Sequence, residues 1–125
     1  MNKPVTLALD VMSGENDPYA SVQAALKLIS ENKSINLHLF GNKEKIRKLL
    51  PKKIEDRLNI HHADEVITMK DSPMDVLRRK KQSSMRLAVE MVAKNKADAC
   101  ISSGNTGALL AISKYLLKTI PNISR

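Results

Sequence analysis

Residues 100–110 read Cys-Ile-Ser-Ser-Gly-Asn-Thr-Gly-Ala-Leu-Leu, and their change of pattern decides the fold class. An apolar run ends near Ser102, two glycines follow within four residues, and a second apolar run begins at Ala108. The whole chain has only four glycines, so their pairing here indicates a turn. The sequence therefore predicts a buried strand over 97–102, a turn, and a helix over 108–117.

The rest of the chain repeats this alternation. Short apolar runs predict strands at 5–12, 35–40 and 58–62. Apolar residues at helical spacing predict a helix after Asp17-Pro18, a short one around 46–50, and helix from Met74 onward. In that last stretch Met85, Ala88, Val89 and Val92 form an apolar stripe, while Arg86, Glu90 and Lys94 are expected on the opposite face. Residues 64–73 are irregular, with a possible strand at 66–67. The order predicts an α/β fold with a largely parallel sheet.

Composition limits the possible partners. The 125 residues carry a net charge of +8, which favours phosphates, anionic lipid or an acidic protein, although a merely solubilising surface fits equally well. Aromatic residues are almost absent, which disfavours stacking on single-stranded nucleic acid. The single cysteine, Cys100, excludes an intrachain disulfide and indicates a reducing compartment. With no targeting segment or run of about 18 apolar residues, we expect a cytoplasmic protein.

The predicted helix over 108–117 is apolar on nearly every side. Such a helix is normally covered all round. Little chain follows Leu117, so we expect either a partner subunit to cover this helix or the domain to be incomplete.

Two loops follow strands that would end at the same edge of a parallel sheet, where ligands bind. They are Asp10–Glu15 and Ser102–Gly107. Glycine turns expose backbone N–H groups, and Ser102, Ser103, Asn105 and Thr106 add uncharged hydrogen-bonding groups, which suits a phosphate or an oxyanion. The alternative is a glycine turn and a helix cap with no further role.

Residues 78–84, Arg-Arg-Lys-Lys-Gln-Ser-Ser, form a third candidate. Four consecutive cations cannot all face one ligand, so a solvated surface is the default interpretation. Ser83-Ser84 also resembles a helix start, which would place hydroxyls and cations at one end that favours anions. No nucleic-acid motif surrounds them. His38, His61 and His62 do not form a metal-ligand pattern, and Cys100 has the surroundings of an inert core thiol.

Three motifs together carry a resemblance to a known family. Residues 9–14 (Leu-Asp-Val-Met-Ser-Gly), 79–85 (Arg-Lys-Lys-Gln-Ser-Ser-Met) and 97–108 (Ala-Asp-Ala-Cys-Ile-Ser-Ser-Gly-Asn-Thr-Gly-Ala) resemble, in this order, the bacterial phosphate acyltransferases of phospholipid synthesis. The resemblance implies a doubly wound α/β fold like that of isocitrate and isopropylmalate dehydrogenases. It implies a homodimer that moves a fatty acyl group from acyl carrier protein to inorganic phosphate. The acyl phosphate would serve glycerol-phosphate acylation, at or near the membrane, without metal or cofactor.

The resemblance also implies site residues. Asn105 and Thr106 would act catalytically by hydrogen-bonding the phosphate or the oxyanion. Phosphate or substrate would contact Asp10, Gly14, Arg79, Lys81, Ser83, Ser84, Ser103, Gly104 and Gly107.

The chain departs from the family pattern in two ways. The first family loop usually reads Asp-x-Met-Gly-Gly-Asp, whereas this chain has Ser13 and Glu15. Family members are also more than twice as long, so we expect residues 1–125 to be the N-terminal portion of one acyltransferase domain. The rival hypotheses are an inactive remnant that binds carrier protein or anionic surfaces and, on charge alone, a nucleic-acid binder.

Overall fold

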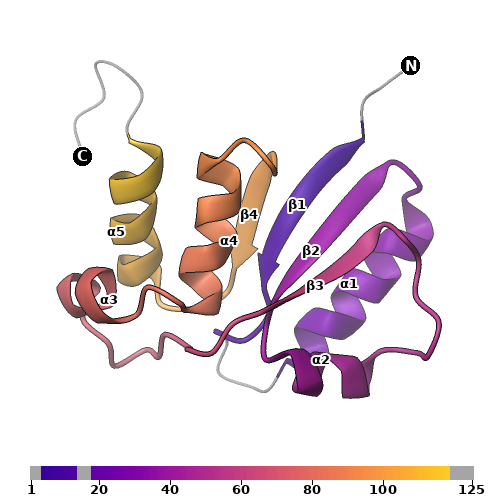
Figure 1. The fold of residues 1–125 in the computed structure, drawn as a ribbon, viewed down its shortest axis with the longest axis horizontal. Helices are drawn as coiled ribbons and strands as arrows, with labels where there is room; N and C mark the ends of the chain where they lie inside the picture. The colour runs from indigo at the N-terminus through magenta and orange to yellow at the C-terminus, as the bar shows by residue number, and fades with distance from the viewer. Residues whose placement is uncertain (1–3, 14–17, 119–125) are drawn as a thin grey trace.

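A computed structural model describes residues 4–13 and 18–118. Four strands form one sheet in the order β3-β2-β1-β4, and every neighbouring pair is parallel (Figure 1). The strands are β1 (Val5–Asp10), β2 (Ile35–Gly41), β3 (Leu58–His62) and β4 (Ala99–Ser102). The helices are α1 (Tyr19–Glu31), α2 (Lys43–Leu49), α3 (Pro73–Arg79), α4 (Ser84–Ala93) and α5 (Thr106–Leu117).

Helices cover both faces of the sheet, which confirms the doubly wound α/β class. On one face, Leu37 and Leu39 of β2 pack with α1 and α2. On the other face, Ala8 and Phe40 pack against Ala88 of α4. A third apolar cluster joins α3, α4 and α5 beside β4, and both α3 and α5 lie at this end of the molecule (Figure 1). Alternate side chains of each central strand are therefore buried against opposite helical layers.

Four helices begin at a polar residue whose side chain accepts a backbone N–H bond from the first turn. These N-caps are Asn42, Ser72, Ser83 and Asn105, for α2, α3, α4 and α5. Such a cap satisfies one of the donors that a helix start leaves unpaired. The helix start expected at Ser83-Ser84 is therefore confirmed, and the helix expected from Met74 is two helices that are separated at Lys80–Ser83.

The structure corrects three expectations. The strand expected to be buried over 97–102 is β4, the outer strand of the described sheet, and only one of its faces is well covered. Cys100 packs against the helices on one face, whereas Ala99 and Ile101 point to the other face, where Ile101 is 51% exposed. No strand forms at 66–67, where the chain makes only an isolated bridge between Glu65 and Ser83. Arg86 is not on a solvated face, because α3 and α5 pack beside it and leave it 8% exposed.

The described residues cover α5 on one side and leave the other side open. Leu110 is 63% exposed, whereas Ala108 and Ile112 are fully buried. Tyr115 is 64% exposed, although the guanidinium of Arg86 lies 5.5 Å from the centre of its ring. Among the described residues, no helix combines the length and the apolar character needed to cross a membrane.

Two histidines form a pair that joins β2 to β3. His38 Nδ1 lies 2.7 Å from His61 Nε2, and the His61 ring stacks on Phe40 at a centroid distance of 4.6 Å. A hydrogen bond between these two nitrogens requires that one be unprotonated. Burial lowers the pKa of both histidines, and the positive charges of His61 on His38 and of Lys43 on His61 add to that effect.

This pair predicts acid sensitivity. Both histidines have a lower pKa in the folded state than in the unfolded chain, where the pKa of His is about 6.5. Their contribution to stability is therefore complete above that pH and is lost as the pH falls through the folded-state pKa values. We expect the melting temperature to drop between pH 7.5 and pH 5.5, and a His38→Asn/His61→Asn variant to show a smaller drop. His62→Gln is the control; an equal drop in all three proteins would contradict the prediction.

Candidate functional site

The sheet reverses its direction of growth between β1 and β4. The chain adds β2 and then β3 on one side of β1, and then crosses over to place β4 on the other side. In open parallel sheets, ligands bind at such a switch point, beyond the carboxyl ends of the strands. Those two ends are Asp10 and Ser102, which are direct neighbours in the parallel register. The topology therefore brings together the two loops in which the sequence predicted a site.

The Asp10 carboxylate ties three elements together at this point. Oδ1 accepts hydrogen bonds from Ser84 Oγ at 2.6 Å and from Met12 N at 3.2 Å, and Oδ2 accepts one from Ser102 Oγ at 2.8 Å. Asp10 is only 4% exposed and Ser84 is fully buried. Because its oxygens already accept three bonds, this carboxylate holds β1, β4 and the start of α4 together. It is not placed as an open ligand for an anion.

The loop after β4 lies against the loop after β1. A Cβ atom on Gly104 would be 2.5 Å from Ser13 Cβ and 2.7 Å from the Ser13 carbonyl oxygen. Glycine is therefore needed at 104 for close approach, and no described glycine has a positive φ. Ser13 is 4% exposed, and its hydroxyl has no hydrogen-bond partner in the part of the chain that the structure describes. Gly14 and Glu15 lie outside the described residues.

The N-terminus of α5 presents donors at this edge. Asn105 Oδ1 accepts a bond from Ala108 N at 3.1 Å, whereas the N–H groups of Thr106 and Gly107 have no acceptor within the helix. Ser103 and Thr106 are exposed, and their hydroxyls form no hydrogen bond within residues 4–13 and 18–118. Unpaired N–H groups, the positive end of the helix dipole and free hydroxyls together make an environment that binds anions.

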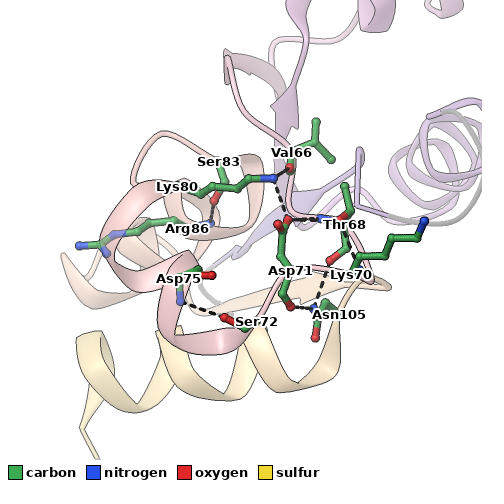
Figure 2. Close-up of polar contacts among 10 residues, drawn as sticks. All are labelled: Val66, Thr68, Lys70, Asp71, Ser72, Asp75, Lys80, Ser83, Arg86 and Asn105. Carbon is green, nitrogen blue, oxygen red and sulfur yellow. Dashed lines mark hydrogen bonds and ion pairs between the residues drawn. The ribbon is translucent and has the colours of Figure 1, made fainter.

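The loop before α3 braces this helix start. The Asn105 side-chain amide donates to the carbonyl oxygens of Thr68 at 3.1 Å and Asp71 at 2.9 Å (Figure 2). The Asp71 carboxylate accepts from Lys80 Nζ and from Thr68 N, and these two bonds lower the pKa of Asp71. Lys80 also donates to the Val66 carbonyl oxygen at 2.7 Å. All hydrogen-bonding groups of the Asn105 amide are thus engaged inside the protein, so Asn105 is a positioning residue in this structure.

The predicted site residues separate into three groups. Ser103, Thr106 and Gly107 lie at the start of α5 and have groups available to a ligand, whereas Gly104 N donates to Ser102 Oγ. Asp10, Ser83 and Ser84 are buried and bonded within the protein, since Ser83 Oγ accepts from Arg86 N and Ser84 donates to Asp10. Arg79 and Lys81 are exposed, at and just after the end of α3.

Sequence reasoning missed two features of this site. It did not identify Lys80 as the ion-pair partner of Asp71, since it treated residues 78–81 as one run of cations. It also did not identify the loop at 66–72 as the brace for Asn105. No periodic signal marks an irregular segment, although a lysine just after a helix is a known partner for nearby carbonyl groups.

Cys100 does not join the site as a nucleophile. Burial raises the pKa of its thiol, and the charge of Asp10 raises it further, so the reactive thiolate is disfavoured. Within the described residues, no three His, Cys, Asp or Glu side chains gather closely enough to hold a metal ion.

Known proteins resemble this chain over nearly its whole length. The family described as "Fatty acid synthesis protein" matches residues 5–125. The phosphate acyltransferase of Methylococcus capsulatus is 48% identical over 123 residues, which make up 96% of this chain and 36% of the relative. The phosphate acyltransferases of Shewanella woodyi and Shewanella sediminis are 50% and 51% identical over 124 residues, which make up 97% of this chain and 36% of each relative. The chain thus spans 36% of the length of these curated relatives.

The Asp10 contacts predict a large loss of stability in Asp10→Ala. Two hydroxyls and one backbone N–H lose their acceptor at a buried position, which we expect to cost about 2–4 kcal/mol in the free energy of unfolding. Asp98→Ala is the matched control, because Asp98 is exposed and accepts one bond, from Thr6 N. It should cost about 1 kcal/mol or less. Urea unfolding measures both values; similar losses would show that Asp10 has no special role.

We expect the two glycines at the start of α5 to differ in how far substitution by alanine lowers stability. Gly104→Ala would place Cβ within 2.7 Å of two Ser13 atoms, and we expect a loss of about 1–3 kcal/mol in stability. In Gly107→Ala the nearest atom is Pro73 Cγ at 3.2 Å, and alanine favours the helix, so the change should stay within about 1 kcal/mol. Thermal unfolding of the two variants compares them directly; a Gly104→Ala protein as stable as wild type would contradict the close approach.

Proposed function

Because the chain belongs to the fatty acid synthesis protein family, we propose that it is the phosphate-binding part of an acyltransferase. The proposed reaction moves a fatty acyl group from acyl carrier protein to inorganic phosphate and supplies acyl phosphate for phospholipid synthesis. The relatives' name, phosphate acyltransferase, supports the class of reaction.

The observation that carries the proposal is the set of unpaired donors at the β1/β4 switch point. The free N–H groups of Thr106 and Gly107 and the hydroxyls of Ser103 and Thr106 lie at the start of α5. Behind them, the buried Ser13 hydroxyl lacks a partner among the described residues. A buried hydroxyl without a partner costs free energy, and a bound phosphate oxygen would relieve that cost.

The proposed reaction requires the protein mainly to bind and orient the phosphate and the thioester. A phosphate oxygen attacks the thioester carbonyl, the new C–O bond forms, and the C–S bond breaks. The proton of hydrogen phosphate passes to the leaving thiolate, so the products are acyl phosphate and a thiol. No covalent enzyme intermediate is required. A thiolate leaves without strong acid catalysis, so the proposed step requires no histidine–carboxylate pair beside the start of α5.

The residues then take two kinds of role. Thr106 would bind phosphate together with Ser103 and the backbone at 106–107. The same groups would stabilise the negative charge that develops on the thioester carbonyl oxygen. Asn105 would act by fixing the direction of α5, since its amide is bonded to Ala108, Thr68 and Asp71. Asp10 would act by fixing β1, β4 and α4 relative to one another. As part of the same proposal, acyl carrier protein is the acyl donor, the protein is a homodimer, and it contacts the membrane surface.

A second candidate function is binding of phosphate without turnover. It is favoured by the 36% share of the relatives' length that this chain spans, because under this candidate the parts of those proteins outside the matched region complete the catalytic site. The two candidates differ in a single measurement, the release of thiol.

The test pairs phosphate binding with turnover. We expect inorganic phosphate, but not chloride at equal ionic strength, to raise the melting temperature of the chain. A Ser103→Ala/Thr106→Val variant should bind phosphate at least about tenfold more weakly, since each lost bond to a charged ligand is worth about 1.5–3 kcal/mol. Ser34→Ala, another exposed serine without a side-chain bond in the described structure, is the matched control. Turnover is followed as phosphate-dependent release of thiol from acyl carrier protein thioester.

The outcomes separate the candidates. Phosphate binding and turnover that both decline in the double variant support the acyltransferase. Phosphate binding that declines in the variant, without turnover in any form, supports the second candidate. A folded wild-type chain that does not bind phosphate would overturn both.

A further inference from the structure

A groove of about 380 Å³ lies where α3, α4 and α5 meet. We call it the basic groove, and it is lined by Met74, Leu77, Arg78, Lys81, Arg86 and Tyr115. Its residues come from α3, α4 and α5 and, at Lys81, from the segment between α3 and α4, so the groove depends on the packing of α3 and α4 against α5. In Figure 2 the Arg86 side chain extends away from the Asn105 contacts. None of the residues proposed to bind phosphate lines the groove.

Positive charge dominates this region. Residues 73–93 and 106–117 carry six cations and two carboxylates. Arg86 is paired with Glu90, at 3.2 Å, and its guanidinium lies 5.5 Å from the centre of the Tyr115 ring. Arg78 and Lys81 are exposed, and neither forms an ion pair within residues 4–13 and 18–118. Two free cations thus flank a guanidinium that is already held in place.

Apolar surface lies beside these charges. Met74 is 62% exposed and Tyr115 is 64% exposed, although both are large apolar side chains. Exposed methionine, tyrosine and arginine are the residue types enriched in protein–protein contacts. A small anion would use the cations but leave this apolar surface uncovered. The combination therefore fits an acidic helix that also carries apolar side chains.

The groove is close to the proposed phosphate site along the chain. Lys81 precedes Ser84 by three residues, and Ser84 Oγ bonds to Asp10 at the switch point. Three residues span at most about 11 Å. A protein bound in the groove would therefore hold a flexible, thioester-bearing arm within reach of that edge.

We propose that the basic groove is the docking surface for an acidic helix of the acyl-carrying protein. The assignment rests on the proposed function for the identity of this partner, and on charge complementarity for the place where it docks. Arg78 and Lys81 contact its carboxylates, and Met74 and Tyr115 cover its apolar side chains.

Binding of purified acyl carrier protein, measured by calorimetric titration at low and at physiological salt, tests the proposal. Arg78→Glu/Lys81→Glu should weaken binding about tenfold or more, since like charges then oppose the partner. Lys45→Glu/Lys48→Glu makes the same charge change at the same spacing on α2, where both lysines are exposed, and should change affinity less than about threefold. Met74→Ala should weaken binding, whereas Met69→Ala, at a similarly exposed methionine outside the groove, should not.

Several results would overturn the proposal. The first is that a folded wild-type chain does not bind the carrier protein. The second is that the two charge-reversal variants weaken carrier binding equally. The third is that Arg78→Glu/Lys81→Glu loses binding to vesicles of anionic lipid but keeps its binding to the carrier protein. Phosphate-induced stabilisation is measured on the same variants and should not change. If phosphate binding fails while the groove variants lose carrier protein, the docking surface stands and the proposed phosphate site does not.

Discussion

The Asp10 carboxylate is the interaction on which the rest of the candidate site depends. It lies at the end of β1, accepts hydrogen bonds from Ser84 and Ser102, and is almost completely buried. A buried carboxylate is costly unless it is well bonded, so the three elements it joins are held in one arrangement. Gly104 N in turn donates to Ser102 Oγ at 3.2 Å, which carries this order into the turn before α5. The Asp10 carboxylate at the end of β1 therefore helps to fix the direction of the α5 N-terminus.

The class of fold could be predicted from the sequence because each element carries a local signal. The periodicity of Val22, Ala25 and Ile29 predicted α1, and the apolar run at 35–40 predicted β2. Position within the sheet has no such signal. The run that contains Cys100 and Ile101 predicted burial, yet β4 is the outer strand of the described sheet, and the strand order depends on long-range pairing. Arg86 likewise matched a polar face by spacing, whereas α3 and α5 enclose it.

The sequence predicted where the candidate site lies, but not the role of each side chain in it. The sequence located both loops of the switch point, since each follows a strand and contains turn residues. It did not separate side chains that hold the site from those that face a ligand. Asn105 and Ser84 had the right chemistry for binding, but the structure engages them inside the protein. Thr106 and Ser103 have less distinctive signals and are the ones with free hydroxyls. Only the contacts distinguish these groups, because both sets are small polar residues.

The outer side of β4 has a consequence for how this chain behaves in solution. The strand reads Ala-Cys-Ile-Ser, with no charge, proline or bulge along it, and its outward backbone groups have no strand partner in the described sheet. Natural sheets usually protect such a margin with lysine, proline or a covering segment. The unpaired N–H and C=O groups along β4 are therefore a template on which a further strand can pair. A second copy of this chain can supply that strand, and the unpaired thiol of Cys100 lies in the same segment.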